Sequence, residues 1–178
     1  RVISDNYSAA VTGGTITIKD NVSLLNSGTY TIDVNKASTL NISGGTIENS
    51  GTSANSYVIQ STDATTVNIN GGTITGIQSV IHISTGSSAV TISGTVIMTT
   101  TASAQPVIYH EGTGLLTILG GTLTAEGAGA PCIRKQSTGG LTISGGLLTS
   151  NKSNVIMAKG SGTGITISGG ILIAKGLS

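Results

Sequence analysis

The sequence predicts an all-β protein, a parallel β-solenoid that forms a single domain over residues 1–178. Three observations predict this fold: an internal repeat, alternation of apolar residues within each copy, and a composition that disfavours helix. Gly, Thr and Ser make up 78 of the 178 residues, whereas charged residues make up 8%. Hydrophobic residues reach 37%, which argues against disorder, since disordered chains combine low hydrophobicity with high charge.

The internal repeat has the pattern apolar-x-apolar-x-Gly-Gly-x-apolar. The residue after the Gly pair falls at positions 15, 46, 73, 95, 122, 147 and 171, so the mean step is 26 residues. Copies of this length that cannot bury an apolar face alone are typical of a stacked solenoid. We therefore expect seven repeats over residues 9–174, with residues 9–16 as a weaker first copy and residues 175–178 as a tail. The other copies are residues 40–47, 67–74, 90–96 (with one Gly fewer), 116–123, 141–148 and 165–172.

Each repeat is expected to contribute three short strands, which gives about seven rungs. Alternation places Leu40 and Ile42 on one face of the first strand, and the Gly pair turns a corner because glycine tolerates positive φ. The second strand turns one apolar residue inward; these residues are Ile16, Ile47, Ile74, Val96, Leu123, Leu148 and Leu172. The third strand has a central inward Ile, and this column is Ile32, Ile59, Ile81, Ile108, Ile133 and Ile156.

This pattern resembles the right-handed parallel β-helix of the pectin-lyase-like superfamily, and in particular the Gly-Gly-Thr-Ile repeats of bacterial surface and adhesin-like proteins. The resemblance implies an extracellular protein, secreted or on the cell surface, with a structural or adhesive role. The superfamily also contains polysaccharide lyases and hydrolases, and glycoside hydrolysis needs paired carboxylates. No two acidic residues share a strand or a turn here, so we expect no enzymatic activity; the acids are Asp5, Asp20, Asp33, Glu48, Asp63, Glu111 and Glu126.

Composition argues against several other functions. Eight Lys and Arg residues against seven acids give a net charge of +1, without the basic face that nucleic-acid binding needs. No apolar run approaches the ~20 residues of a membrane span. His82 and His110 lie on different rungs without a third ligand in phase, so we expect no metal and no other cofactor. Cys132 stands where neighbouring repeats have valine, and it should be a small hydrophobic wall residue.

One column of the third strand carries unusual side chains. The residue after the central Ile should point to solvent, and on three successive rungs it is His82, Tyr109 and Arg134. Tyr and Arg are enriched in binding hot spots, so these three residues are a candidate site for a surface glycan or a host protein. An ordinary solvent-facing column is the alternative. The whole column is Asp33, Gln60, His82, Tyr109, Arg134 and Met157. Side chains expected just beyond it are His110, Glu111 and Lys135.

Threonine and asparagine columns are expected on the other two faces. The first-strand column is Asn41, Asn68, Thr91, Thr117, Thr142 and Thr166. The second-strand columns are Thr15, Thr46, Thr73, Thr95 and Thr122, with Thr17, Thr75, Thr124 and Thr149 two positions further on. Such arrays are similar to the faces of β-solenoid ice-binding proteins, although Glu48 and several apolar residues interrupt them. Hydroxyl and amide ladders between parallel strands are the alternative explanation.

The two ends of the repeat array are apolar, whereas solenoids normally require polar caps. Ile3 lies eight residues before Val11, which is the third-strand spacing, so residues 1–8 are predicted to hold a third strand. The last repeat ends after its second strand, so the chain would begin with the strand type that comes next in the repeat. Both head-to-tail stacking into a fibre and a cut through a longer solenoid fit this pattern. The residues that would meet in a fibre are Val2, Ile3, Ile171, Leu172 and Ile173.

These observations favour a non-enzymatic, extracellular, structural or adhesive solenoid, either a self-associating fibre subunit or the stalk of a surface adhesin. A carbohydrate- or protein-binding β-helix module and an ice-binding protein are the two alternatives.

Overall fold

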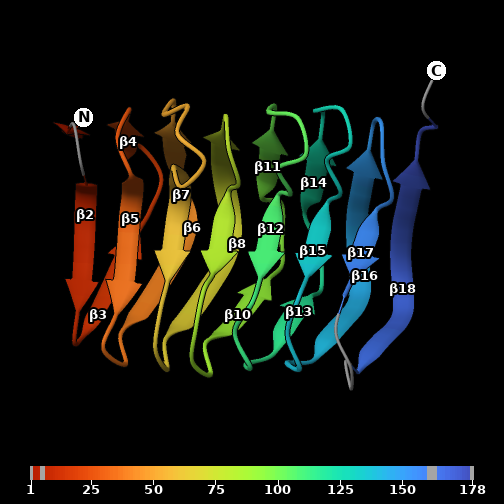
Figure 1. Ribbon diagram of the computed structural model, residues 1–178. Helices are drawn as coiled ribbons and strands as arrows, with labels where there is room; N and C mark the ends of the chain where they lie inside the picture. The colour runs from red at the N-terminus through yellow and green to blue at the C-terminus, as the bar shows by residue number, and fades with distance from the viewer. Residues whose placement is uncertain (1, 5–6, 160–163, 177–178) are drawn as a thin grey trace.

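The computed structural model describes residues 2–4, 7–159 and 164–176, and it is an all-β parallel β-solenoid of the right-handed β-helix type. Its strands form one eleven-stranded and one seven-stranded sheet. The described chain makes about six turns along a single axis (Figure 1). The predicted fold class is therefore confirmed, with about six turns where about seven rungs were predicted.

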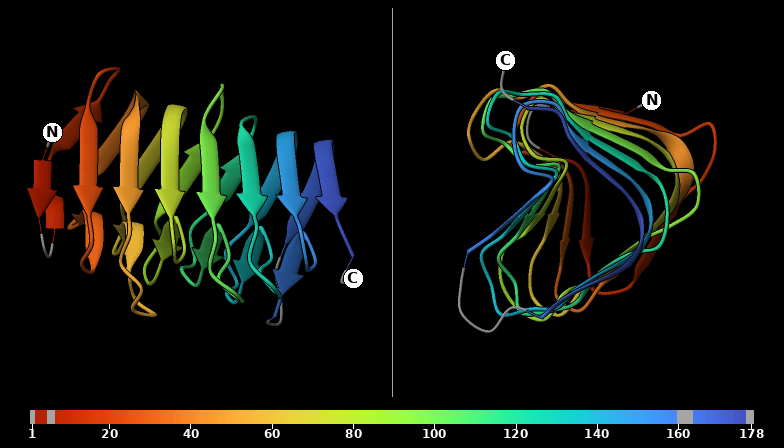
Figure 2. Two further views of the ribbon diagram at one scale, coloured as in Figure 1. Left: turned by 90° about the horizontal axis from the view of Figure 1, so that it is seen from above. Right: turned by 90° about the vertical axis from the view of Figure 1, so that its right-hand side faces the viewer.

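The smaller sheet is the predicted stack of third strands, and we call it the third-strand sheet. Its central isoleucines pair in register from rung to rung, so that Ile81 lies between Ile59 and Ile108. In the axial view the outline of the solenoid is indented on this side (Figure 2). Its strands are β2 (Tyr7–Thr12), β5 (Tyr30–Asn35), β7 (Tyr57–Ser61), β9 (Ile81–Ile83), β12 (Ile108–His110), β15 (Ile133–Lys135) and β17 (Ile156–Ala158).

The larger sheet holds the first and second strands of each rung. On four rungs these two strands form one bent strand through the Gly pair, where the sequence predicted two. Gly45 and Gly72 have φ values of +86° and +92°, and a register shift near Ser43 absorbs the bend. The bent strands are β6 (Thr39–Asn49), β8 (Thr66–Gly76), β16 (Leu141–Ser150) and β18 (Ile165–Ala174). The shorter strands are β1 (Val2–Ser4), β3 (Thr15–Ile18), β4 (Ser23–Asn26), β10 (Ala89–Ile92), β11 (Ile97–Thr100), β13 (Leu116–Ile118) and β14 (Thr122–Ala125).

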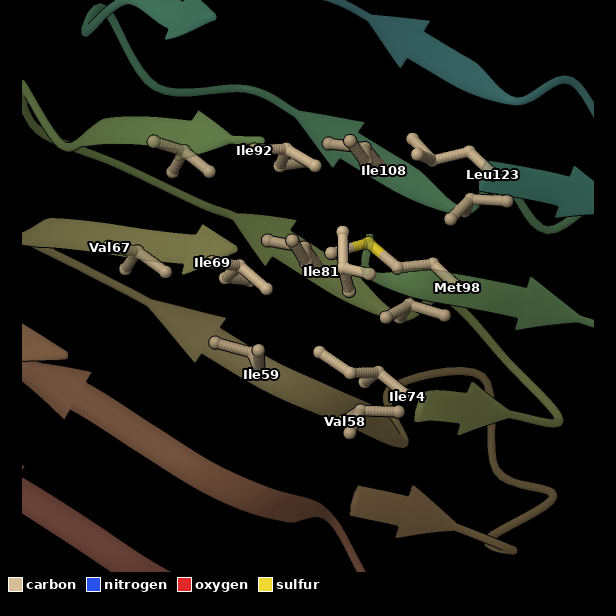
Figure 3. Packing of buried hydrophobic residues seen from close by; sticks show 14 of the residues in the cluster. Val58, Ile59, Val67, Ile69, Ile74, Ile81, Ile92, Met98, Ile108 and Leu123 are labelled. Carbon is tan, nitrogen blue, oxygen red and sulfur yellow. The ribbon is translucent and has the colours of Figure 1, made fainter. Parts of the chain in front are cut away.

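Apolar side chains from all three faces fill the interior as one continuous cluster (Figure 3). Ile59, Ile74 and Ile81 have no exposed surface. Most members are Ile and Val, whose branched side chains suit a pleated, buried surface. Cys132 belongs to this wall, as predicted. Its thiol donates to the carbonyl oxygen of Thr149 over 3.0 Å, and burial raises its pKa to about 12, so it is an inert packing residue.

The strands of the first repeat occupy different positions in the rung from those predicted. β2 lies in the third-strand sheet, with Ala9 opposite Ile32. β3 is a first strand, because Ile16 pairs with Leu40. The predicted copy over residues 9–16 is therefore wrong, and Thr15, Ile16 and Thr17 do not belong to the second-strand columns.

The physical reason lies at the two corners of this rung. Gly13 and Gly14, both at positive φ, make the turn from a third strand to a first strand. The corner that elsewhere holds a Gly pair is built by Asp20 and Asn21 instead, with Asn21 at φ +66°. β4 follows this corner as the true second strand, where Leu24 pairs with Ile47.

The N-terminal strand β1 also occupies a different position in the rung from the one predicted. Val2 pairs with Leu24 and Ile3 with Leu25, so β1 belongs to the second-strand column. The predicted third strand in residues 1–8 is therefore wrong, because β2 already occupies that phase. Side chains of residues 1–8 lie outside the described part of the chain.

The rung with a single Gly shifts its second strand by two residues. Ile97 pairs with Thr73 and Met98 with Ile74, where the sequence placed Thr95 and Val96. Gly94, at φ +61°, begins a wider turn that contains both residues. Val96 is still buried, whereas Thr95 lies outside the threonine columns. The corrected columns are Thr46, Thr73, Ile97, Thr122 and Leu147, and Glu48, Thr75, Thr99, Thr124 and Thr149.

Candidate functional site on the third-strand sheet

The predicted outer column of the third-strand sheet exists in register. His82 pairs with Gln60 on one side and Tyr109 on the other, and Tyr109 pairs with Arg134. Asp33 and Met157 continue the column at its two ends. The sequence therefore placed the three candidate residues on successive rungs correctly.

Exposure along this column differs from the expectation. His82 is only 9% exposed and Gln60 only 5%, whereas Tyr109 and Arg134 are partly exposed. The His82 ring is covered by Tyr57, whose ring centroid lies 4.4 Å away at an interplanar angle of 52°. The prediction that His82 faces solvent is therefore wrong, because a neighbouring aromatic ring lies over it on the indented side of the solenoid.

The rings form a ladder along the solenoid axis, which we call the outer ladder: Tyr30, Tyr57, His82, Tyr109 and Arg134. Tyr30 and Tyr57 stack at 6.0 Å and 6°, and His82 and Tyr109 stack at 5.0 Å and 28°. The Arg134 guanidinium carbon lies 5.6 Å from the centre of the Tyr109 ring, within the range of a cation–π contact. Successive rungs therefore bring these five side chains into one continuous stack.

Tyr30 and Tyr57 were not predicted to be part of this site, although the sequence places both at the same position of the repeat. Both occupy the same repeat position, two residues before the central Ile, and they pair in register. Alternation puts that position on the inward face, so a contact with the outward side chain of His82 was not expected.

A hydrogen-bonded chain fixes His82 within the ladder. Its Nδ1 lies 2.8 Å from Gln60 Oε1, and its Nε2 lies 2.8 Å from Glu111 Oε2. Gln60 Nε2 in turn donates to Ser84 Oγ over 2.9 Å. At the other end of the ladder, the Tyr109 hydroxyl donates to Gln136 Oε1 over 2.6 Å. The polar atoms of the ladder are thus largely committed to neighbours within the protein.

Burial sets the protonation of the ladder. It lowers the pKa of His82, and the hydrogen bond to Glu111 opposes this decrease. Burial raises the pKa of Tyr57 to about 12, with smaller contributions from Tyr30 and Glu111. Burial and then Glu111 also raise the pKa of Tyr109. At neutral pH both Tyr57 and Tyr109 therefore carry their protons.

His110 and Lys135 do not join this site. Each lies two residues after a central inward Ile, and both side chains have 0% exposure. They pair with each other in register on the inner face of the sheet. The expectation that they lie just beyond Arg134 on the surface is therefore wrong, whereas Glu111 does contact the ladder through His82.

The first-strand face carries the expected polar column. Asn41 pairs with Asn68, and Asn68 with Thr91. The Asn68 amide donates to Asn41 Oδ1 over 2.9 Å. This is a hydrogen bond between rungs of the kind expected if the Thr and Asn columns serve to link neighbouring strands. Ice binding by the threonine arrays stays a prediction.

No cluster of three His, Cys, Asp or Glu side chains that could hold a metal occurs in the described part of the chain. Within the same residues, no pocket opens at the surface, and no helix has the length and apolar character of a membrane span. Comparisons with family models, with curated proteins and with solved structures found no match for this chain. Fold and ladder together define the protein as a parallel β-solenoid with a polar aromatic ladder on its third-strand sheet.

Proposed function

We propose that this protein is a non-enzymatic structural or adhesive rod outside the cell, of the kind that the Gly-Gly-Thr-Ile resemblance implies. The observation that carries the proposal is the unbroken in-register stacking of three columns of strands around one core. Each turn adds about 4.8 Å, so about six turns extend the chain by about 29 Å along one axis. Stacked repeats of this kind give length and stiffness without a closed active site.

The outer faces support a spacer role. Their columns consist mainly of Thr and Asn, and the Asn68 amide donates to Asn41 on the neighbouring rung. The outer ladder adds stacked rings on the third face, which hold successive rungs together. These features strengthen contacts along the axis, the direction in which a stalk carries load.

The premise from which the head-to-tail fibre was predicted is not met in the structure. The fibre was inferred from complementary phases at the two ends, but β1 and the second half of β18 both lie in the second-strand column. Along the chain, each second strand is followed by a third strand. In a head-to-tail joint the strand after β18 would therefore have to be a third strand, whereas β1 is a second strand. Self-association stays a prediction that a direct measurement must decide.

Location is tested by labelling the source cells with an antibody raised against the intact chain. Label on unpermeabilised cells, seen by immunogold electron microscopy at extended surface structures, is the expected result. Label that appears only after permeabilisation would contradict the proposal. An unrelated cytosolic antigen of the same cells serves as the permeability control.

A binding module is the second candidate function. The surroundings of Tyr109 limit the contacts that a partner could make with it. His82 stacks on one face of the Tyr109 ring and Arg134 lies over the other, so neither face is open for stacking a sugar. The ring edge, the Arg134 guanidinium and the Glu111 carboxylate are what a partner would meet. The Arg134 guanidinium offers hydrogen-bond donors to the carboxylate groups of an acidic glycan, whereas the Glu111 carboxylate opposes such a partner.

This second function is tested on a glycan array with the double variant Tyr109→Ala and Arg134→Ala. Binding of acidic glycans by the wild type and its loss in the variant is the expected result. Thr91→Ala, on the first-strand face, is the matched control and should bind as the wild type does. Equal binding by wild type and double variant would show that the ladder is ordinary surface.

A further inference from the structure

Two basic side chains lie inside the apolar core on adjacent rungs. His110 of β12 and Lys135 of β15 are directly opposite each other in the parallel ladder. Both side chains have 0% exposure. We call them the core basic pair. Buried Lys and His are rare unless they are paired, because removing a charge from water is costly.

Among the described residues, the ladder neighbours of the core basic pair carry no opposite charge. The ladder neighbour of His110 in β9 is Ile83, and the neighbour of Lys135 in β17 is Ala158. The ion pair of the described residues, His82 with Glu111, lies on the outer face. Tyr109 and Arg134, which flank the pair along their strands, belong to that outer face too.

The polar atoms of the pair are incompletely satisfied. Neither ring nitrogen of His110 makes a hydrogen bond of normal geometry, although the Gly114 backbone approaches the ring. Lys135 Nζ donates to the Ser137 carbonyl oxygen over 2.7 Å and contacts Ser137 Oγ at 3.4 Å. A positive charge on His110 would therefore be buried on the rung next to Lys135 without a counter-ion among its ladder neighbours.

The protonation states follow from this arrangement. Burial lowers the pKa of His110 from its ordinary 6.5 to about 4, with a further decrease from Lys135 and a small opposing effect from Gly114. Burial also lowers the pKa of Lys135. The folded protein thus holds His110 neutral at pH 7, whereas the unfolded chain protonates it below about 6.5.

We propose that the core basic pair is an acid-sensitive point of the rod, where proton uptake by His110 destabilises the folded chain. Because the pKa of His110 is lower in the folded state, its contribution to stability is complete above pH 6.5. That contribution is lost as the pH falls from 6.5 toward 4. Acid would therefore destabilise the folded chain through a site inside the rod.

The test is the urea midpoint of the intact chain at pH 7.5, 6.0, 5.0 and 4.5. His110→Ile is the informative variant, because Ile83 fills the same column one rung earlier. The wild-type midpoint should fall steeply below pH 6.5, and His110→Ile should lose at least half of that decrease. His82→Gln, which removes the other histidine, should keep most of it. The proposal would be overturned if the urea midpoint of His110→Ile fell with decreasing pH as much as that of the wild type. It would also be overturned if only His82→Gln lost this pH dependence.

A second measurement covers the case in which His110→Ile does not fold. The imidazole signals of His110 are followed by NMR in the wild type from pH 7.5 downward. They should stay at their neutral positions to pH 5 while the protein remains folded. A reversible titration of His110 near pH 6.5 in the folded protein would overturn the proposal.

Discussion

Single isoleucines in the third-strand column stabilise this protein because each is covered from two neighbouring rungs. Ile108 lies between Ile81 and Ile133 in the ladder and has no exposed surface. Ile97, on the second-strand face, is 48% exposed although it is the same residue type. The two positions therefore separate the effect of burial from that of strand propensity.

Ile108→Ala should lower the free energy of unfolding by about 2–5 kcal/mol, because it leaves a cavity where the rungs cannot close up. Ile97→Ala, the control, should cost less than about 1 kcal/mol, since its side chain is half in water. Urea unfolding followed by circular dichroism measures both. Similar losses at the two positions would contradict the assignment of Ile108 to the core.

Among the strands, the Gly pairs are what allow rungs to stack closely at the bend. A Cβ built on Gly72 would lie 2.8 Å from the Gly44 carbonyl oxygen and 2.9 Å from its carbon. Gly72 also has φ +92°, which side-chain-bearing residues rarely adopt. Gly13 has φ +70° too, but a Cβ there would meet nothing within 4 Å.

Gly13→Ala and Gly72→Ala separate backbone strain from steric overlap. Gly13→Ala should cost about 1–2 kcal/mol, the penalty of a left-handed conformation. Gly72→Ala should cost at least about 1 kcal/mol more, because the methyl group presses on the backbone of the previous rung. Thermal unfolding of the two variants measures the difference. Equal costs would show that contact between stacked Gly pairs is unimportant.

The rod as a whole is apolar at its last described rung. Ile171 is 62% exposed and Ile173 is 38% exposed, whereas Leu172 packs partly against the core. In a single chain these side chains are covered from one side. If copies do associate end to end, they gain a second neighbour there.

Leu172→Ala should therefore destabilise the single chain less than Ile108→Ala does, since Leu172 has neighbours on one side. Urea unfolding at low protein concentration measures this difference. Sedimentation velocity at high concentration measures association, and loss of larger species in Leu172→Ala would support the head-to-tail prediction. A monodisperse wild type at every concentration would exclude it, and an equal loss of stability at both positions would contradict a one-sided environment for Leu172.

Part of the candidate site could be predicted from the sequence because side-chain direction in a strand is local. The rung-by-rung order of His82, Tyr109 and Arg134 followed from the constant position of the central Ile. The same alternation would have placed His110 inward, two residues after Ile108, and this signal was overlooked. The burial of His82 could not be predicted, because it depends on Tyr57, which comes from the preceding rung.

The sequence by itself determined the repeat, the three-strand rung and the inward isoleucine column, since period-2 alternation and glycine turns are properties of short segments. Tertiary structure decided the phase of the first rung, where Asp20 and Asn21 replace a Gly pair. It also decided which outer residues are covered and that a histidine and a lysine share the core. These outcomes depend on contacts between rungs that lie about 26 residues apart in the chain, and no short stretch of sequence contains both partners of such a contact.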